Sequence, residues 1–133
     1  MNKTILVTAS LLGVLSIIIG AFGAHGLKQL ISNESLQSFE IGVRYQMYHA
    51  LLLLFVGNST FIKVKTKKIM YYLIVLGVLF FSGSIYGLAT NSLSNIDFKT
   101  IGFITPIGGL LLILAWGLMI IDFIKLPPKN DNY

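Results

Sequence analysis

Long runs of apolar residues, separated by short polar stretches, occupy most of this chain. Four of these runs contain no Asp, Glu, Lys or Arg: residues 5–24, 45–62, 69–90 and 101–121. Each is close to the ~20 residues that a helix needs to cross ~30 Å of hydrocarbon. Because water is absent there, such a segment must satisfy its own backbone hydrogen bonds, as a helix does. The pattern therefore predicts an all-α integral membrane four-helix bundle.

The same pattern predicts the domain organisation, a single four-span transmembrane domain over residues 1–126 and a short cytoplasmic tail over residues 127–133. Pro127 ends the last helix, because proline cannot continue its hydrogen-bond ladder. The first apolar run follows Lys3 and ends in small residues, as a signal peptide does. It is longer than the ~7–15 apolar residues of a usual signal core. We therefore expect it to be retained as a membrane-spanning helix.

The connection between the first two runs is amphipathic, unlike the others. After Ser32, which can cap a helix start, apolar residues such as Phe39 and Val43 recur at helical spacing among polar ones. This predicts a short amphipathic interfacial helix between spans one and two that leads into span two. Glu40 and Arg44 lie one turn apart on it. They can form either a solvated surface pair or a partly buried pair over the mouth of the bundle.

Composition supports the membrane interpretation. Hydrophobic residues make up 55% of the chain and charged residues only 11%, against ~25% charged residues in a typical soluble domain. A formal net charge of +5 would suggest nucleic acid in a soluble protein. Here the lysines are explained by the membrane surface, so we expect the lipid bilayer as partner and no nucleic acid. The chain has no cysteine, which excludes disulfides and cysteine-ligated metals.

The basic residues predict the orientation. With four spans, both termini and the second connection share one side of the membrane, which holds seven lysines: Lys3, Lys63, Lys65, Lys67, Lys68, Lys125 and Lys129. The opposite side holds Lys28, Arg44 and Lys99. Basic residues of short loops are retained in the cytoplasm. We therefore expect both termini to be cytoplasmic.

Small residues predict which helix faces meet, because they allow backbones to approach closely in lipid. They are Gly13, Ser16, Gly20 and Gly23 in the first span, Gly83 and Gly87 in the third, and Thr105, Gly108 and Gly109 in the fourth.

Polar residues gather in the outer halves of the spans once this topology is assumed. The candidate site residues are His25, Glu40, Arg44, Tyr45, Gln46, His49, Ser84, Tyr86 and Thr105. Polar groups in a bilayer are costly and tend to face each other or a cavity. The cluster is interpreted either as a hydrogen-bond network that holds the bundle together, or as a small outer-leaflet site for a lipid headgroup, a quinone or another ligand. In both interpretations several of these side chains face the bundle interior.

Catalytic interpretations find little support. His25 and His49 near the outer surface would permit a bis-histidine haem, or a metal held together with Glu40, but nothing else in the sequence favours either. Ser82 and Ser84 lack a Ser-His-Asp arrangement, and no Gly-rich phosphate loop is present. We therefore expect a protein that is not an enzyme and that holds no cofactor and no metal.

Four motifs in order carry a family resemblance: residues 20–27 (GAFGAHGL), 39–51 (FEIGVRYQMYHAL), 81–86 (FSGSIY) and 105–109 (TPIGG). The chain resembles the YwdK/YgdD family of small bacterial four-span membrane proteins, a domain of unknown function with animal relatives. The resemblance covers nearly the whole chain and implies a four-helix fold in the bacterial plasma membrane. It implies no activity, substrate or catalytic residue. In one departure, Ala115 precedes Trp116 where the family pattern has glycine, which bears on packing.

Two classes of function remain. The first is a non-enzymatic structural or accessory membrane protein, present as a homo-oligomer or bound to another membrane complex. The second is a lipid or small-amphiphile binding or transport protein that uses the outer-leaflet polar site. A carrier needs an enclosed, polar-lined cavity, whereas an accessory protein is packed shut.

Overall fold

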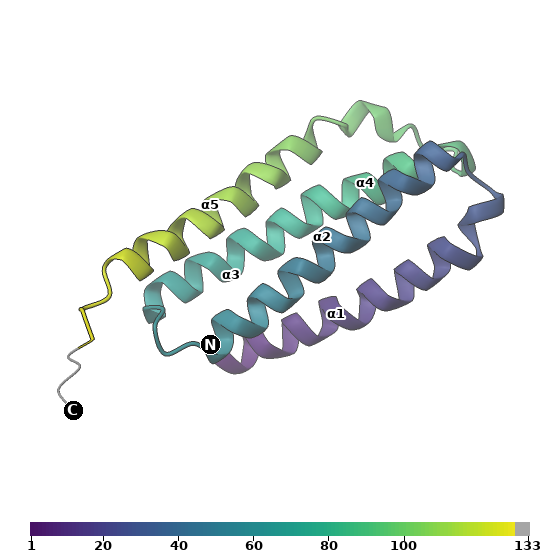
Figure 1. The fold of residues 1–133 in the computed structure, drawn as a ribbon. Coiled ribbons are helices and arrows are strands. Elements are labelled where there is room, and N and C mark those ends of the chain that lie inside the picture. The colour runs from purple at the N-terminus through teal and green to yellow at the C-terminus, as the bar shows by residue number, and fades with distance from the viewer. Residues whose placement is uncertain (130–133) are drawn as a thin grey trace.

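The computed structural model describes residues 1–129 and consists of long helices joined by short turns (Figure 1). The elements are α1 (Asn2–His25), η1 (Leu27–Gln29), α2 (Asn33–Asn58), α3 (Val64–Val78), η2 (Leu79–Gly83), α4 (Ser84–Ala89), η3 (Asn91–Leu93), η4 (Phe98–Ile101) and α5 (Ile104–Ile124). The all-α prediction is confirmed for these residues. Residues 130–133 of the predicted tail lie outside the described residues.

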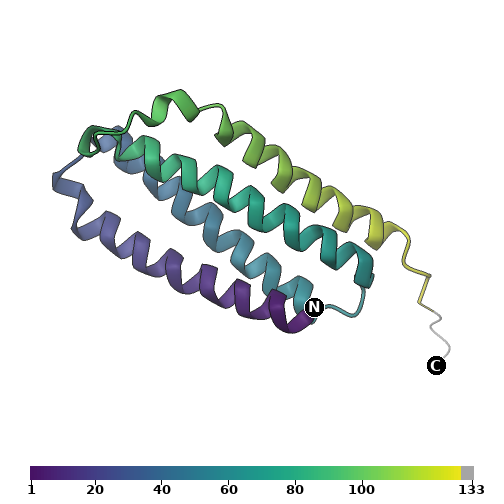
Figure 2. The same ribbon diagram turned by 180° about the vertical axis from the view of Figure 1, so that it is seen from behind.

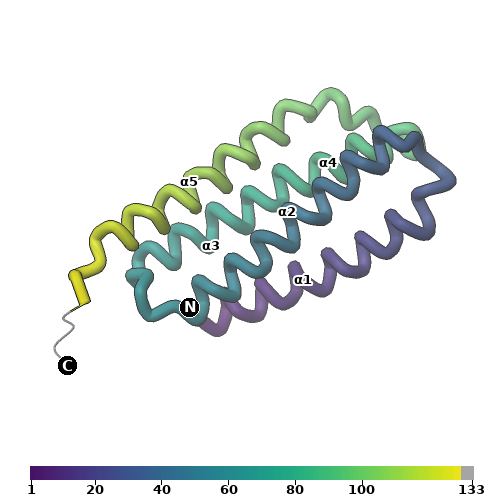
Figure 3. The backbone as a smooth tube through the Cα atoms, in the orientation of Figure 1, coloured from purple at the N-terminus to yellow at the C-terminus, as the bar shows by residue number. Residues whose placement is uncertain are grey.

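The long helices run antiparallel, so the N-terminus and the end of α5 lie at the same end of the molecule (Figures 1 and 2). α3, η2 and α4 follow one another as a single rod. α1 packs along α2, α2 packs against α3 and α4, and α5 packs against α3 and η2. α1 and α5 therefore lie at opposite edges of the helix array (Figure 3).

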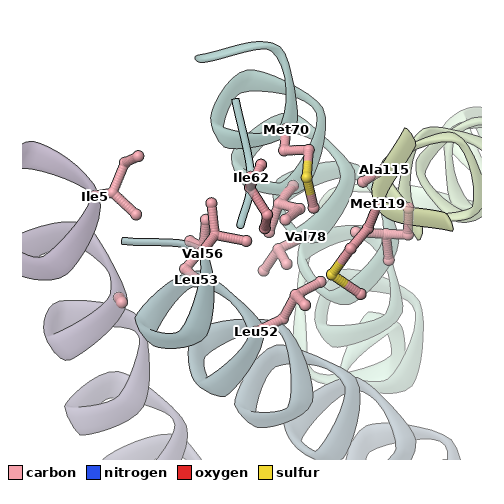
Figure 4. Packing of buried hydrophobic residues seen from close by; sticks show 12 residues of the cluster. Ile5, Leu52, Leu53, Val56, Ile62, Met70, Val78, Ala115 and Met119 are labelled. Carbon is pink, nitrogen blue, oxygen red and sulfur yellow. The ribbon is translucent and has the colours of Figure 1, made fainter. Parts of the chain in front are cut away.

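One apolar cluster joins α1, α2, α3 and α5 near the end that holds the N-terminus (Figure 4). Ile5 of α1, Leu53 of α2 and Ile74 of α3 are fully buried in it, and Ala115 of α5 is as well. Lipid tails are as apolar as leucine, so burial alone gives little drive for helices to associate in a membrane. Van der Waals packing between these side chains has to hold the array together.

Backbones approach closely where α5 crosses the α3–η2 rod. A Cβ atom added at Gly108 would meet the backbone nitrogen of Phe81, with the Phe80 carbonyl carbon at 2.8 Å and the Gly77 carbonyl oxygen at 2.9 Å. Glycine is required here, because any side chain would push two backbones apart. The prediction that Gly108 lies in a helix contact is thereby confirmed.

Four of the other predicted glycines divide into two groups. A Cβ atom at Gly20 would lie 3.2 Å from Val43, and one at Gly23 would lie 2.7 Å from Phe39, so both face α2 at close range. Gly13 and Gly83 have nothing within 4 Å of the same position, so their prediction as packing sites is wrong. Spacing along one helix indicates a common stripe, but a neighbour need not cover its whole length.

The predicted interfacial helix is not a separate element. α2 begins at Asn33 and continues without a break to Asn58, so the amphipathic segment forms its first turns. Ser32 caps this start as predicted, accepting a hydrogen bond from the Ser35 backbone N–H at 3.1 Å. The apolar face of the segment packs on α1 through Phe39, which is 3% exposed. Because this contact buries the apolar face against α1, the segment need not lie in the membrane interface. It therefore continues directly into the rest of α2.

Within residues 1–129, three helical stretches are long and apolar enough to cross a membrane: Asn2–Gln29, Val64–Ala89 and Phe98–Ile124. α2 is of similar length at 26 residues, but its N-terminal turns hold Glu34, Glu40 and Arg44, which lower its hydropathy.

Candidate functional site

Gln46 is the centre of a hydrogen-bond chain that links three helices. Its side chain is 4% exposed. The Nε2 group donates to the Leu12 carbonyl oxygen of α1 at 3.0 Å, and Oε1 accepts from the Tyr86 hydroxyl of α4 at 2.7 Å. A glutamine amide carries both a donor and an acceptor, so one side chain on α2 serves both neighbours.

Two serines tie the η2–α4 region to the helices on either side. Ser82 donates its hydroxyl to the Gly42 carbonyl oxygen of α2 at 2.7 Å, a fully buried bond. Ser84 is hydrogen-bonded to the Thr105 hydroxyl of α5 and also donates to the Phe80 carbonyl oxygen of its own rod. Ser82 comes from a π-helical turn, a feature often found at functional sites.

His49 is held by hydrogen bonds at both ring nitrogens and is 4% exposed. The Trp116 indole Nε1 donates to His49 Nε2 at 3.2 Å, and Nδ1 lies 2.7 Å from the Tyr45 carbonyl oxygen. An indole N–H can only donate, so Nε2 is the acceptor and Nδ1 carries the proton given to Tyr45. The ring is therefore a neutral imidazole in one defined tautomer.

Tyr45 and His49 also line a groove of about 320 Å³ between α2 and α5. The other lining residues are Phe81, Gly109, Leu112, Ile113 and Trp116. The Tyr45 and Phe81 ring centroids lie 5.0 Å apart, and the His49 and Trp116 rings meet nearly edge to face at 6.2 Å. The groove is thus walled mainly by aromatic rings.

The predicted site residues do not form one enclosed site. Gln46 pairs with Tyr86 and Ser84 pairs with Thr105, while Tyr45 and His49 lie at the groove. His25 is exposed at the end of α1. The expectation that several of these side chains face the interior is met by the buried members, but their contacts are separate.

Of the two arrangements predicted for Glu40 and Arg44, the structure has the solvated surface pair. Arg44 Nη2 lies 4.0 Å from Glu40 Oε2, and their side chains are 59% and 51% exposed, respectively. An exposed pair of this kind on one helix contributes only ~0.3–0.5 kcal/mol. It therefore bears little on the site.

Two contacts of the candidate site are not predicted from the sequence. Trp116 is predicted only as a packing residue, and Ser82 stands outside the candidate set. A signal was available for Trp116, because an indole N–H inside an apolar run needs an acceptor. The partner of Ser82 is a backbone carbonyl, which leaves no trace in the sequence.

The end of the array that holds the N-terminus has polar contacts of its own. Asp122 of α5 is 7% exposed, and its Oδ2 accepts from the Lys63 backbone N–H at 3.0 Å. Lys67 is 5% exposed, and its Nζ donates to Asn2 Oδ1 at 3.3 Å. These bonds join α5 and α1 to the start of α3.

Metal ligands do not converge anywhere in residues 1–129, where no group of three or more His, Cys, Asp or Glu side chains could hold an ion. Both nitrogens of His49 are already engaged. Chemically, the site offers interhelical hydrogen bonds and an aromatic groove.

Long apolar helices with hydrogen bonds between them define the class of this chain, a helical membrane protein. A family model described as "Protein of unknown function (DUF423)" matches residues 19–109, which hold the whole candidate set. The chain belongs to this family, and the resemblance noted in its sequence is confirmed.

Relatives align along nearly their full length. A UPF0382 membrane protein of Staphylococcus haemolyticus is 40% identical over 126 residues, which cover 92% of this chain and 97% of the relative. YwdK of Bacillus subtilis is 34% identical, with coverage of 92% and 98%. The inner membrane protein YgdD of Escherichia coli is 30% identical, with coverage of 99% and 98%. No solved structure matches the chain.

Proposed function

We propose that this chain crosses the plasma membrane of a bacterium four times, with both termini in the cytoplasm. Relatives described as membrane proteins support the location, and one of them, YgdD, is described as an inner membrane protein. α2 is antiparallel to α1 and α3 and connects their opposite ends (Figure 1). If those two apolar helices cross the bilayer, α2 has to cross with them.

The low hydropathy of α2 is compatible with this topology. Gln46 and His49, the polar residues in its middle turns, are buried and hydrogen-bonded within the protein. Arg44 and Glu40 are exposed about one and two turns, respectively, nearer the end that we assign to the outer surface. A charged side chain there can extend to the interface.

Within that membrane, the proposed role is that of a non-enzymatic structural or accessory protein. The observation that carries this proposal is the closure of the interior. Among residues 1–129, every buried side-chain nitrogen and oxygen has a hydrogen-bond partner. A carrier would aim such groups at its cargo, whereas here several of them hold one helix to the next, as Gln46 does.

Native mass spectrometry of the protein released from lipid tests the accessory role. An accessory protein should appear at a multiple of the 14.7 kDa chain mass or together with a second protein. Dilution before release controls for chains that merely share a micelle. A monomer without a protein partner at every dilution would contradict this role.

A second candidate, binding of a lipid or small amphiphile, is favoured by one observation. The groove between α2 and α5 is lined by two of the predicted site residues, Tyr45 and His49. The same mass spectra test this candidate, since a bound amphiphile adds its mass to the released chain. Spectra without such an addition would speak against it.

A further inference from the structure

We propose that the groove between α2 and α5 binds the planar head of a lipid-soluble quinone. The inference rests on the second proposed function, amphiphile binding, and names its ligand class. Size is the first argument. An apolar cavity of ~150 Å³ accommodates one benzene ring, and this groove offers about 320 Å³. A substituted ring or a fused pair of rings fits that space.

The walls favour a flat ligand over a flexible chain. Tyr45, Phe81 and Trp116 surround the groove, and aromatic rings gain most from other rings at centroid distances of ~4.5–7 Å. A lipid tail would need only aliphatic walls. Gly109 has no side chain, and a Cβ atom there would lie 3.7 Å from Phe81. One wall is therefore open for a ring to lie against.

One hydrogen-bond donor remains for a quinone carbonyl. Among the lining residues, the N–H groups of Trp116 and His49 are used on His49 Nε2 and on the Tyr45 carbonyl oxygen. The Tyr45 hydroxyl is the donor that these two bonds leave free, and Tyr45 is 41% exposed. A ring with carbonyl groups and no donor of its own matches this arrangement.

The groove opens sideways from the helix array. Ile113 at its rim is 67% exposed and Trp116 is 43% exposed. With the chain in a bilayer, both face the hydrocarbon phase in which quinones dissolve. A ligand can then enter from the membrane without crossing the protein interior.

Trp116 makes the proposal directly measurable, because it is the single tryptophan of the chain and lines the groove. Menadione, a naphthoquinone, would be titrated into the full-length protein in nanodiscs of phosphatidylcholine and phosphatidylglycerol. We expect quenching of Trp116 fluorescence that saturates. Tyr45→Phe, which removes the donor, should weaken the apparent Kd about fivefold.

Gly109→Leu fills the open wall and should abolish the saturable quenching. Gly117→Leu is the matched control on the same helix, because a Cβ atom at Gly117 meets nothing within 4 Å. It should leave the titration unchanged. Far-UV circular dichroism checks that both variants fold, and the Tyr45→Phe titration tests the site independently of them.

Linear quenching that is equal in the wild type, Tyr45→Phe and Gly109→Leu would overturn the inference, because it reports collisions in the bilayer. A parallel titration with acyl-brominated phosphatidylcholine separates the ligand class from amphiphile binding itself. Saturable quenching by the brominated lipid, with linear quenching by menadione, would overturn the quinone assignment and leave amphiphile binding standing. Linear quenching by both would overturn the two together.

Discussion

Single polar side chains in this array are placed as matched donors and acceptors. Trp116 can only donate and meets the acceptor nitrogen of His49, while Gln46 accepts on one side and donates on the other. Interhelical hydrogen bonds in membrane proteins contribute only ~0.6 kcal/mol on average and up to ~1.7 kcal/mol. Leaving such a group unpaired in hydrocarbon costs more. The bonds therefore determine which helix faces meet more than they determine overall stability.

At this scale the first prediction concerns Gln46→Leu. The leucine keeps the volume but leaves the Tyr86 hydroxyl without its acceptor, so we expect a loss of about 1 kcal/mol in the free energy of unfolding. Denaturation in mild detergent by added dodecyl sulfate, followed by circular dichroism, measures it. Gln37→Leu, at an exposed position of α2, is the matched control and should change stability little.

Tyr86→Phe supplies the second half of a double-mutant cycle. If the two side chains act through their 2.7 Å hydrogen bond, the double variant should be less destabilised than the sum of the single variants. Strict additivity would mean that Gln46 acts through Leu12 or through packing alone.

At the scale of helices, Gly108 of α5 sets a close backbone contact with the α3–η2 rod. The rod changes to a π-helical turn between Leu79 and Gly83, beside this contact. The same turn supplies Ser82 to α2 and Phe81 to the groove. Backbone packing, interhelical hydrogen bonding and the groove wall thus meet in one turn of helix.

The prediction that belongs to the element scale is a comparison of two substitutions on α5. Gly108→Ala drives a methyl group into the Phe80–Phe81 backbone, and overpacking of this kind costs ~1–3 kcal/mol. Gly117→Ala places the same methyl group in open space and should be neutral or stabilising, because alanine favours helix by ~1 kcal/mol over glycine. Thermal unfolding in detergent compares the two. Equal effects would contradict the close backbone contact.

For the molecule as a whole, topology decides which surfaces face the cell interior. The absence of native cysteine makes this measurable without background. Lys65→Cys lies at the start of α3 and Ser94→Cys lies between α4 and α5, at the opposite end of the array. We expect a membrane-impermeant thiol reagent added to intact cells to label Ser94→Cys and to spare Lys65→Cys until the membrane is opened.

Lys3→Cys is the control for this experiment, because the N-terminus shares the side of Lys65 and should be protected with it. Labelling of both loop positions from outside would contradict the four-span topology. Labelling of Lys65→Cys alone would keep four spans and reverse their orientation.

Local properties of the sequence determined the helices and their ends. Apolar runs give three of the long rods, because hydropathy depends only on neighbouring residues. Ser32 caps α2, and Glu40 faces Arg44, because capping and one-turn spacing are likewise local. The gathering of polar residues toward one end of the spans also followed from helix direction alone.

Only the tertiary structure decided which of those residues touch. Whether His49 meets Trp116 or Ser84 depends on the rotations and relative heights of α2, α4 and α5, which hydropathy does not encode. The unbroken course of α2 depends in the same way on Phe39 finding Gly23 on another helix. A stripe of polar or small residues specifies a helix face, and the packing of whole helices specifies its partner.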